Sequence, residues 1–525
     1  MTAESVSMNR SFVSVGGATA LSRLLGFVRD MLLASVLGAG PVADAFFAAF
    51  RFPNLFRRLF AEGAFNAAFI PLFSKALQEG GEDAARDFAR RVISWLIAAL
   101  VVLTVLAEIF MPAVIAAFVP GFLDDPEKFD LTVLLTRICF PYLACMSLMA
   151  AYGGVLNGLR RFLAAAFAPV LLNVVLIGVL AGWVLWADAG TETAGIALSV
   201  GVLIGGVAQL ALVVWGLART GYLPRFVRPR FDAGVKRFWA LAVPAILTGG
   251  ITQINIFIGT IIASSGASAI SYLYYADRLY QLPLGVIGIA IGVVLLPELS
   301  RHLTGGRAAE AASAQNQALF AALVLTVPAA LALTVIAEPV IRVLFERGAF
   351  GAEATARTAA ALVMFACGLP AFVMIKVFQP GFFARQDTRT PTIFAAISAV
   401  VNIGLSLALF PSLAHVGIAL ATAIAAWVNT ALLVAMLVRR KHFQPTAPQL
   451  RHAAIVLVAA TVMAVALMVA AVPLDALLRP ASGLATQIAG LAALVAIGGV
   501  VYFGILHFAG VQRLGRLADA LRGRA

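Results

Sequence analysis

The chain contains a long series of apolar stretches, most of them long enough to cross a lipid bilayer as a helix. Of its 525 residues, 62% are hydrophobic and 12% are charged, whereas a soluble domain is about half apolar and about a quarter charged. A membrane-spanning helix needs roughly 20 consecutive, mostly apolar residues. The composition therefore excludes a water-soluble enzyme and predicts an all-α polytopic membrane protein.

Charged residues, glycines and prolines divide the apolar sequence into fourteen predicted spans. Their limits are 11–38, 41–77, 87–119, 131–158, 162–187, 193–218, 235–264, 267–303, 308–342, 355–384, 390–411, 415–438, 450–473 and 482–508. We expect a six-helix N-lobe over 1–220, a six-helix C-lobe over 221–440, two appended spans within 441–510, and a tail over 511–525.

The distribution of Lys and Arg predicts the orientation of these spans. Loops that follow even-numbered spans, together with both tails, hold 25 of the 38 basic residues, and the loop 219–237 alone holds six. Loops that follow odd-numbered spans hold only four: Lys128, Arg347, Arg357 and Arg479. Because basic loops stay on the cytoplasmic side, we expect both termini in the cytoplasm.

An internal repeat with a period near 229 residues relates the two predicted lobes. Pro141 and Asn173 lie 32 residues apart, and Pro370 and Asn402 repeat that spacing. Both copies begin on the predicted cytoplasmic side, so the repeat is parallel. Transporters built from parallel repeats bind their substrate between the halves and alternate by rocking one half against the other.

Nine of the 38 basic residues are assigned to neither the loops nor the tails. At the bilayer centre an arginine costs roughly 2.5–3.5 kcal/mol even on a lenient insertion scale. They are Arg23, Arg29, Arg51, Arg57, Arg58, Arg137, Arg278, Arg342 and Lys376. Arg137 and Arg342 lie near span ends, from which their side chains can reach the interface. The others require a water-filled cavity or a partner of opposite charge.

Spans 1, 2 and 8 carry six of these arginines against five carboxylates, namely Asp30, Asp44, Glu62, Asp277 and Glu298. Internal ion pairs, such as Arg58 with Glu62 or Arg29 with a neighbouring carboxylate, are one interpretation. They cannot neutralise all six guanidinium groups. The surplus predicts an anionic ligand, because the planar guanidinium fork matches phosphate oxygens.

The sequence lacks the motifs of other function classes. It has no Walker loop, no HExxH and no Ser–His–Asp candidate. The three cysteines lie in apolar runs and the five histidines are scattered, so we expect no disulfide framework, no metal site and no cofactor. The net charge of +13 is explained by basic loops, so no nucleic-acid partner is expected.

Four segments resemble the MurJ (MviN) family of lipid II flippases, within the multidrug/oligosaccharidyl-lipid/polysaccharide exporter superfamily. They read SRLLGFVRD, GAGPVADAFFAAFRFPNLFRRLFAEGAFNAAFIP, YYADRLYQLPLGVIGIAIGVVLLPELS and FFARQDTRTP. The resemblance implies a transporter of the bacterial inner membrane with a central cationic cavity. Spans 13 and 14 would hold the undecaprenyl tail of lipid II, and membrane lipids and peptidoglycan synthases would be partners.

Residue roles follow from the same resemblance. It implies substrate binding by Arg23, Arg29, Arg57 and Arg278. Acidic or gating roles would fall on Asp30, Asp44, Glu62 and Asp277, and Arg51, Arg58 and Lys376 are further cavity candidates. Residues 238–263 and 390–411, which cover spans 7 and 11, contain no Asp or Glu, so the sodium site of some members is not expected here.

Three other functions stay open at this point. The nearest is a flippase for another undecaprenyl-diphosphate-linked oligosaccharide, such as an O-antigen unit. A cation or drug antiporter of the same superfamily should favour unpaired carboxylates over arginines. A non-transporting membrane scaffold would not need nine basic residues at membrane depth.

The orientation generates the first testable prediction. A cysteine placed at Arg228 should react with an impermeant maleimide only after the membrane is permeabilised, whereas one at Asp124 should react in intact cells. A cysteine-free chain (Cys139→Ala, Cys145→Ala, Cys367→Ala) serves as the control. The reverse labelling pattern would contradict the predicted topology.

Overall fold

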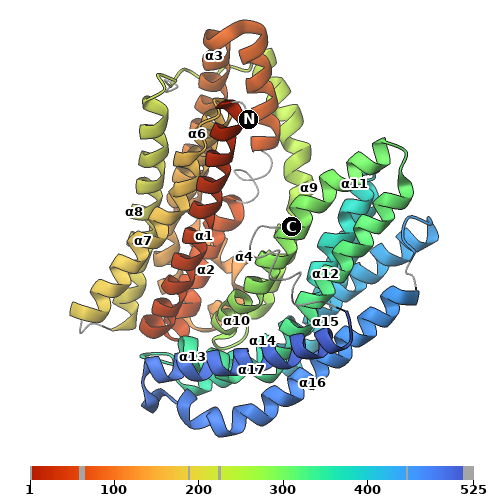
Figure 1. The fold of residues 1–525 in the computed structure, drawn as a ribbon. Helices are drawn as coiled ribbons and strands as arrows, with labels where there is room; N and C mark the ends of the chain where they lie inside the picture. The colour runs from red at the N-terminus through yellow and green to blue at the C-terminus, as the bar shows by residue number, and fades with distance from the viewer. Residues whose placement is uncertain (1–2, 58–64, 187–189, 223–225, 445–446, 512–525) are drawn as a thin grey trace. The chain divides into compact units, whose positions relative to one another are not determined.

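The computed structural model describes residues 3–57, 65–186, 190–222, 226–444 and 447–511. Throughout these ranges the regular structure is helical, without a strand (Figure 1). Nine helical segments within them are long and apolar enough to cross a membrane. The all-α polytopic class is confirmed, and the count of fourteen spans stays a prediction.

The first of two compact units covers Met1–Ser271. Its helices are α1 (Ala3–Leu37), α2 (Pro41–Arg57), α3 (Asn66–Ile109), α4 (Met111–Phe118), the 3-10 helix η2 (Pro120–Asp124), α5 (Pro126–Cys139), α6 (Tyr142–Gly158), α7 (Leu163–Trp186), α8 (Thr191–Ala218) and α9 (Ala233–Ser264). Within this unit α1 packs along α7, α7 along α8, and α2 along α5.

The second unit covers Tyr272–Ala525, and α10 (Ala269–Pro283) runs across the boundary. Its other helices are the π-helix η3 (Leu284–Gly288), α11 (Ile289–Thr304), α12 (Ala308–Val335), α13 (Ala337–Phe345), α14 (Ala352–Phe383), α15 (Arg389–Arg439), α16 (Ala447–Leu478), the 3-10 helix η4 (Pro480–Ser482) and α17 (Leu484–Phe508). Here α14 packs on α12 and α15, and α16 on α17. Non-helical backbone at Ala414 interrupts α15 between the two spans predicted there.

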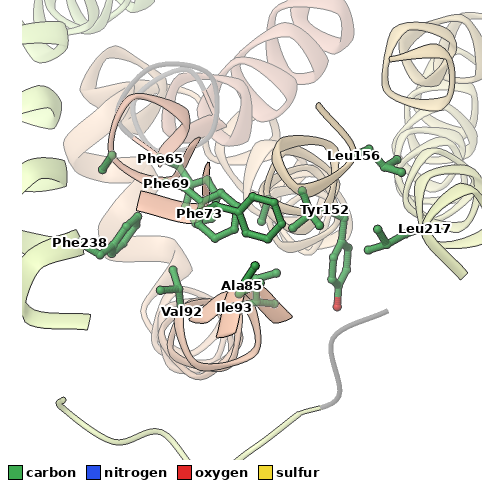
Figure 2. Packing of buried hydrophobic residues seen from close by; sticks show 14 of the residues in the cluster. Phe65, Phe69, Phe73, Ala85, Val92, Ile93, Tyr152, Leu156, Leu217 and Phe238 are labelled. Carbon is green, nitrogen blue, oxygen red and sulfur yellow. The ribbon is translucent and has the colours of Figure 1, made fainter. Parts of the chain in front are cut away.

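Aromatic side chains form part of a buried hydrophobic cluster in the first unit (Figure 2). Phe65, Phe69 and Phe73 stack in sequence along one side of their helix, with ring centroids 5.0 and 5.5 Å apart. Phe238 of α9 meets Phe65 edge-on at 5.4 Å. Offset and edge-on ring pairs are favourable beyond the apolar area they bury, so this cluster fixes α9 against the start of α3.

Glycines let neighbouring helices approach closely in both units. A Cβ at Gly206 of α8 would lie 2.5 Å from the Tyr142 ring of α6. In the second unit, a Cβ at Gly368 of α14 would lie 2.9 Å from the backbone of Ala423 in α15. Lipid supplies no hydrophobic force between helices, so close packing of small residues is a main source of their association.

The two units end corresponding helices in the same way, which supports the sequence repeat. After α6, Arg161 N–H donates to Leu156 O, and Arg160 takes a left-handed conformation. After α14, Asp387 N–H donates to Phe382 O, and Gln386 is left-handed. This type of cap closes the last turn of a helix. The donor, the acceptor and the left-handed residue of the second cap each lie 226 positions after those of the first.

The FFARQDTRTP segment then starts α15. Asp387 Oδ1 accepts a hydrogen bond from the N–H of Thr390 at 2.9 Å, and Arg440 Nη1 donates to Asp387 Oδ2 at 2.6 Å. The hydrogen bond from Arg440 holds the pKa of Asp387 at about 2, well below its usual range. The carboxylate is therefore charged at every physiological pH, as a helix N-terminus favours.

Candidate functional site

Arg29 is buried in α1 and is held from two sides. The residue is only 7% exposed to solvent. Nε and Nη2 donate to Asp30 Oδ1 at 3.1 and 2.8 Å, and Nη1 donates to Asn173 Oδ1 of α7 at 2.9 Å. The predicted pairing of Arg29 with a neighbouring carboxylate is thereby confirmed.

Arg29 and Asp30 are adjacent in α1, and the structure brings their side chains together, while Arg23 is exposed. The reason is reach: the long arginine side chain folds back to its neighbour's carboxylate, although adjacent residues leave a helix about 100° apart.

Asp44 joins three segments of the first unit. It is fully buried in α2, and its Oδ2 accepts from Lys128 Nζ of α5 at 2.9 Å. Its Oδ1 accepts from the N–H and the hydroxyl of Ser271, at 2.8 and 2.5 Å, where α10 begins. A buried carboxylate requires such partners, so Asp44 ties α2 to α5 and to the start of α10.

Lys128 corrects the sequence analysis, which counted it as a loop residue. It lies in the first turn of α5, is 9% exposed, and its Nζ lies 3.9 Å from the centre of the Phe122 ring. The sequence does indicate that Asp44 needs a cationic partner, because its carboxylate is isolated in an apolar segment. Sequence alone could not show which cation, because 84 residues separate the pair.

Arg51, a further cavity candidate, connects α2 with α9. Its Nη1 donates to Thr260 Oγ1 at 2.9 Å, and that hydroxyl also donates to the carbonyl of Ile256. Thr260 is fully buried and Arg51 is half-buried. The guanidinium therefore occupies a defined position instead of extending freely from the helix.

The second unit contributes Asp277 and Arg278, both half-buried in α10. Arg278 Nη2 donates to the Tyr274 hydroxyl at 3.1 Å, and its guanidinium lies 4.7 Å from the centre of that ring. Asp277 accepts from the side chain of Gln281. A π-helical turn follows this helix, and such turns are frequent at functional sites.

The remaining predicted residues divide into two groups. Lys376 is exposed on α14, and its Cγ lies 3.6 Å from where a Cβ would stand on Gly288 of η3. Arg57 is the last residue of α2, but its side chain lies outside what the structure describes, as do Arg58 and Glu62 altogether.

The described part of the chain holds no cluster of metal ligands, and one hollow in the first unit is lined by acidic side chains. Among those residues no group of three His, Cys, Asp or Glu side chains could hold a metal ion. A shallow hollow of about 460 Å³ is lined by three carboxylates, those of Glu127, Asp130 and Glu192. Its charge has the wrong sign for a phosphate.

Comparison with known proteins decides the family. The family model described as lipid II flippase MurJ matches residues 33–508. The chain belongs to the MurJ family. A probable lipid II flippase MurJ from Rhizobium meliloti (strain 1021) is 53% identical over 459 residues, covering 87% of this chain and 85% of that protein.

Solved structures agree with this MurJ-family assignment. The structure "Lipid II flippase MurJ, inward closed conformation" matches with a TM-score of 0.78 and 26% identity, covering 94% of this chain and 98% of that one. An inward-facing MATE family transporter of the MOP superfamily matches with a TM-score of 0.64 and 15% identity, covering 80% and 95%. The second likeness shows the fold alone.

The buried pair generates a stability prediction for this MurJ-family chain. Lys128→Met leaves the Asp44 carboxylate buried without its cation, and breaking a buried pair in this way costs about 3–5 kcal/mol. We expect a correspondingly lower stability in detergent micelles, measured by thermal and denaturant unfolding, and a substantial recovery when Asp44→Asn is added. Lys236→Met, at an exposed lysine of α9, is the matched control. Equal behaviour of the two lysine variants would contradict the pairing.

Proposed function

We propose that this chain flips lipid II from the cytoplasmic to the periplasmic leaflet of the bacterial inner membrane. Lipid II combines a polyprenyl tail, a diphosphate and a bulky disaccharide–peptide head. The tail can remain in lipid during transfer, whereas the charged head cannot cross an apolar core unaided. The transporter must therefore offer a polar, cationic passage for the head.

The observation that carries the proposal is the buried, hydrogen-bonded guanidinium of Arg29 in a MurJ-family chain. An arginine at membrane depth is expensive to retain and marks a functional site by default. With Arg23, Arg57 and Arg278 it supplies four guanidinium groups for a diphosphate. Arg51, Arg58 and Lys376 add cationic character to the same passage.

Carboxylates have a complementary role in this proposal. Asp30 and Asp44 pair with Arg29 and Lys128, and together with Glu62 and Asp277 they offset the positive charge of the passage. Asp44, which binds Ser271 at the start of α10, suits a gating role. Its hydrogen bonds can break and reform as helices move.

Transport proceeds by alternating access between two lobes, residues 1–220 and 221–440. Spans 13 and 14, within 441–510, would hold the undecaprenyl tail. Both termini lie in the cytoplasm, and membrane lipids surround the apolar helices. Transport rather than bond-breaking chemistry is proposed because the sequence carries no catalytic motif. Peptidoglycan synthases on the outer surface would consume the product.

Another undecaprenyl-diphosphate-linked oligosaccharide is the alternative cargo, since the diphosphate and tail are the same. Competition separates the two. Purified protein in nanodiscs should bind lipid II more tightly than undecaprenyl diphosphate carrying an O-antigen unit. Equal affinity would show that only the diphosphate and tail are recognised.

The arginines generate the next prediction. Arg278→Ala should abolish complementation in cells depleted of their own flippase while membrane abundance stays near normal, because a half-buried arginine that lines a polar passage contributes little to folding. Arg278→Lys should also fail, since an ammonium cannot replace the guanidinium fork. Arg301→Ala, at an exposed arginine of α11, is the control. If abundance falls in step with activity, the arginine is structural.

The driving force provides a further prediction. Moving one uncompensated charge across the membrane costs or gains about 2.3 kcal/mol per 100 mV. Asn402 accepts hydrogen bonds from Ser406 and Thr422, and neither span 7 nor span 11 contains a carboxylate for sodium. Lipid II export should therefore depend on membrane potential and remain unchanged when potassium replaces sodium at fixed potential. A steep sodium requirement would contradict this expectation.

A further inference from the structure

Asn173 marks the internal repeat in the sequence, and its structural position suggests a role of its own. It lies near the middle of α7 and is 5% exposed. Helix α7 packs along α1, so the Asn173 amide is enclosed between the two helices. A buried amide must have both its donor and its acceptor satisfied.

The amide nitrogen is fixed by backbone carbonyls. Nδ2 donates to the carbonyl of Ser22 in α1 at 2.9 Å and lies 3.3 Å from the carbonyl of Pro169, one turn earlier in α7. The amide packs directly on this face of α1, because a Cβ at Gly26 would stand 3.7 Å from it, in ordinary van der Waals contact. With Nδ2 directed at these carbonyls, Oδ1 is turned toward Arg29.

Ser22, Gly26 and Arg29 occupy one stripe of α1, at positions i, i+4 and i+7. Asn173 therefore contacts a single face of α1. Its Oδ1 accepts a hydrogen bond from Arg29 Nη1 at 2.9 Å. Asp30 holds the other edge through Nε and Nη2. All three guanidinium nitrogens thus donate to two different residues, which restrains the plane of the guanidinium more than the single Asp30 oxygen would alone.

We propose that Asn173 is a positioning residue, which sets the plane of the Arg29 guanidinium for the diphosphate of the substrate. The inference rests on the proposed function, in which Arg29 binds that diphosphate. In this proposal Asn173 does not contact the diphosphate. It restricts the Arg29 side chain before the substrate arrives, so that less conformational entropy is lost when the substrate binds. Preorganisation of this kind increases affinity by lowering the cost of ordering.

The internal repeat supplies a matched control. Asn402 is the counterpart of Asn173, is likewise buried, and its Oδ1 accepts from the hydroxyls of Ser406 and Thr422. Within the seventh span, residues 238–263 include no Arg or Lys; the basic residues Lys236 and Arg237 stand at its start. The second copy therefore has no counterpart of Arg29. An asparagine that served only helix packing should matter equally at both positions.

The test measures lipid II affinity for the full chain in phosphatidylethanolamine–phosphatidylglycerol nanodiscs. Asn173→Leu should weaken binding about tenfold, the effect of one hydrogen bond to a charged group, whereas Asn402→Leu should leave affinity unchanged. In an Arg29→Ala background, Asn173→Leu should have no further effect. Asn173→Asp, which keeps the acceptor, should restore most of the affinity.

Three results would overturn the inference. One is an unchanged affinity for Asn173→Leu. Another is the same loss with and without Arg29, which would make Asn173 a packing residue only. The third is a wild-type affinity for Arg29→Ala alone, which would remove the role of Arg29 in the proposed function as well. Should Asn173→Leu fail to fold, Asn173→Ser, whose hydroxyl is too short to reach Nη1, replaces it in the same cycle.

Discussion

Burying Arg29 in a membrane-spanning helix costs free energy that its neighbours must offset. Asp30 supplies the opposite charge and Asn173 a neutral acceptor, so the guanidinium is both compensated and oriented. The two partners have different roles. Asp30 balances the charge of the guanidinium, and Asn173 adds a hydrogen bond at the third nitrogen, which restrains its plane. The packing of α1 along α7 keeps the side chains of Arg29, Asp30 and Asn173 in contact.

The same constraint accounts for the asymmetry of the chain. The repeated scaffold is visible in the matching helix caps at Arg160 and Gln386. The two copies differ in charge: Arg29 of α1 contacts Asn173, whereas residues 238–263 of the seventh span, the counterpart of the first span in the repeat, include no basic residue. Charged side chains at membrane depth are costly and are expected where a ligand or a partner requires them.

Hydropathy predicts most helices of this protein because the bilayer requires long apolar segments with internally satisfied backbone groups. The limits of α7, predicted over 162–187, agree with Leu163–Trp186. Contacts between side chains far apart in the sequence were harder to predict. Lys128 was assigned to a loop, and its contact with Asp44 joins residues 84 apart. Asn173 was recognised only as a repeat marker, because a polar residue in an apolar run does not reveal which neighbour it binds.

The central claim is that this chain brings lipid II to the outer leaflet. Its most direct test is depletion of the protein in growing cells, followed by treatment of intact cells with an enzyme that cleaves lipid II but cannot cross the membrane. The account predicts that total lipid II rises while the fraction cleaved from outside falls, and that re-expression restores it. If the cleaved fraction stays constant during depletion, the chain does not supply lipid II to the outer leaflet.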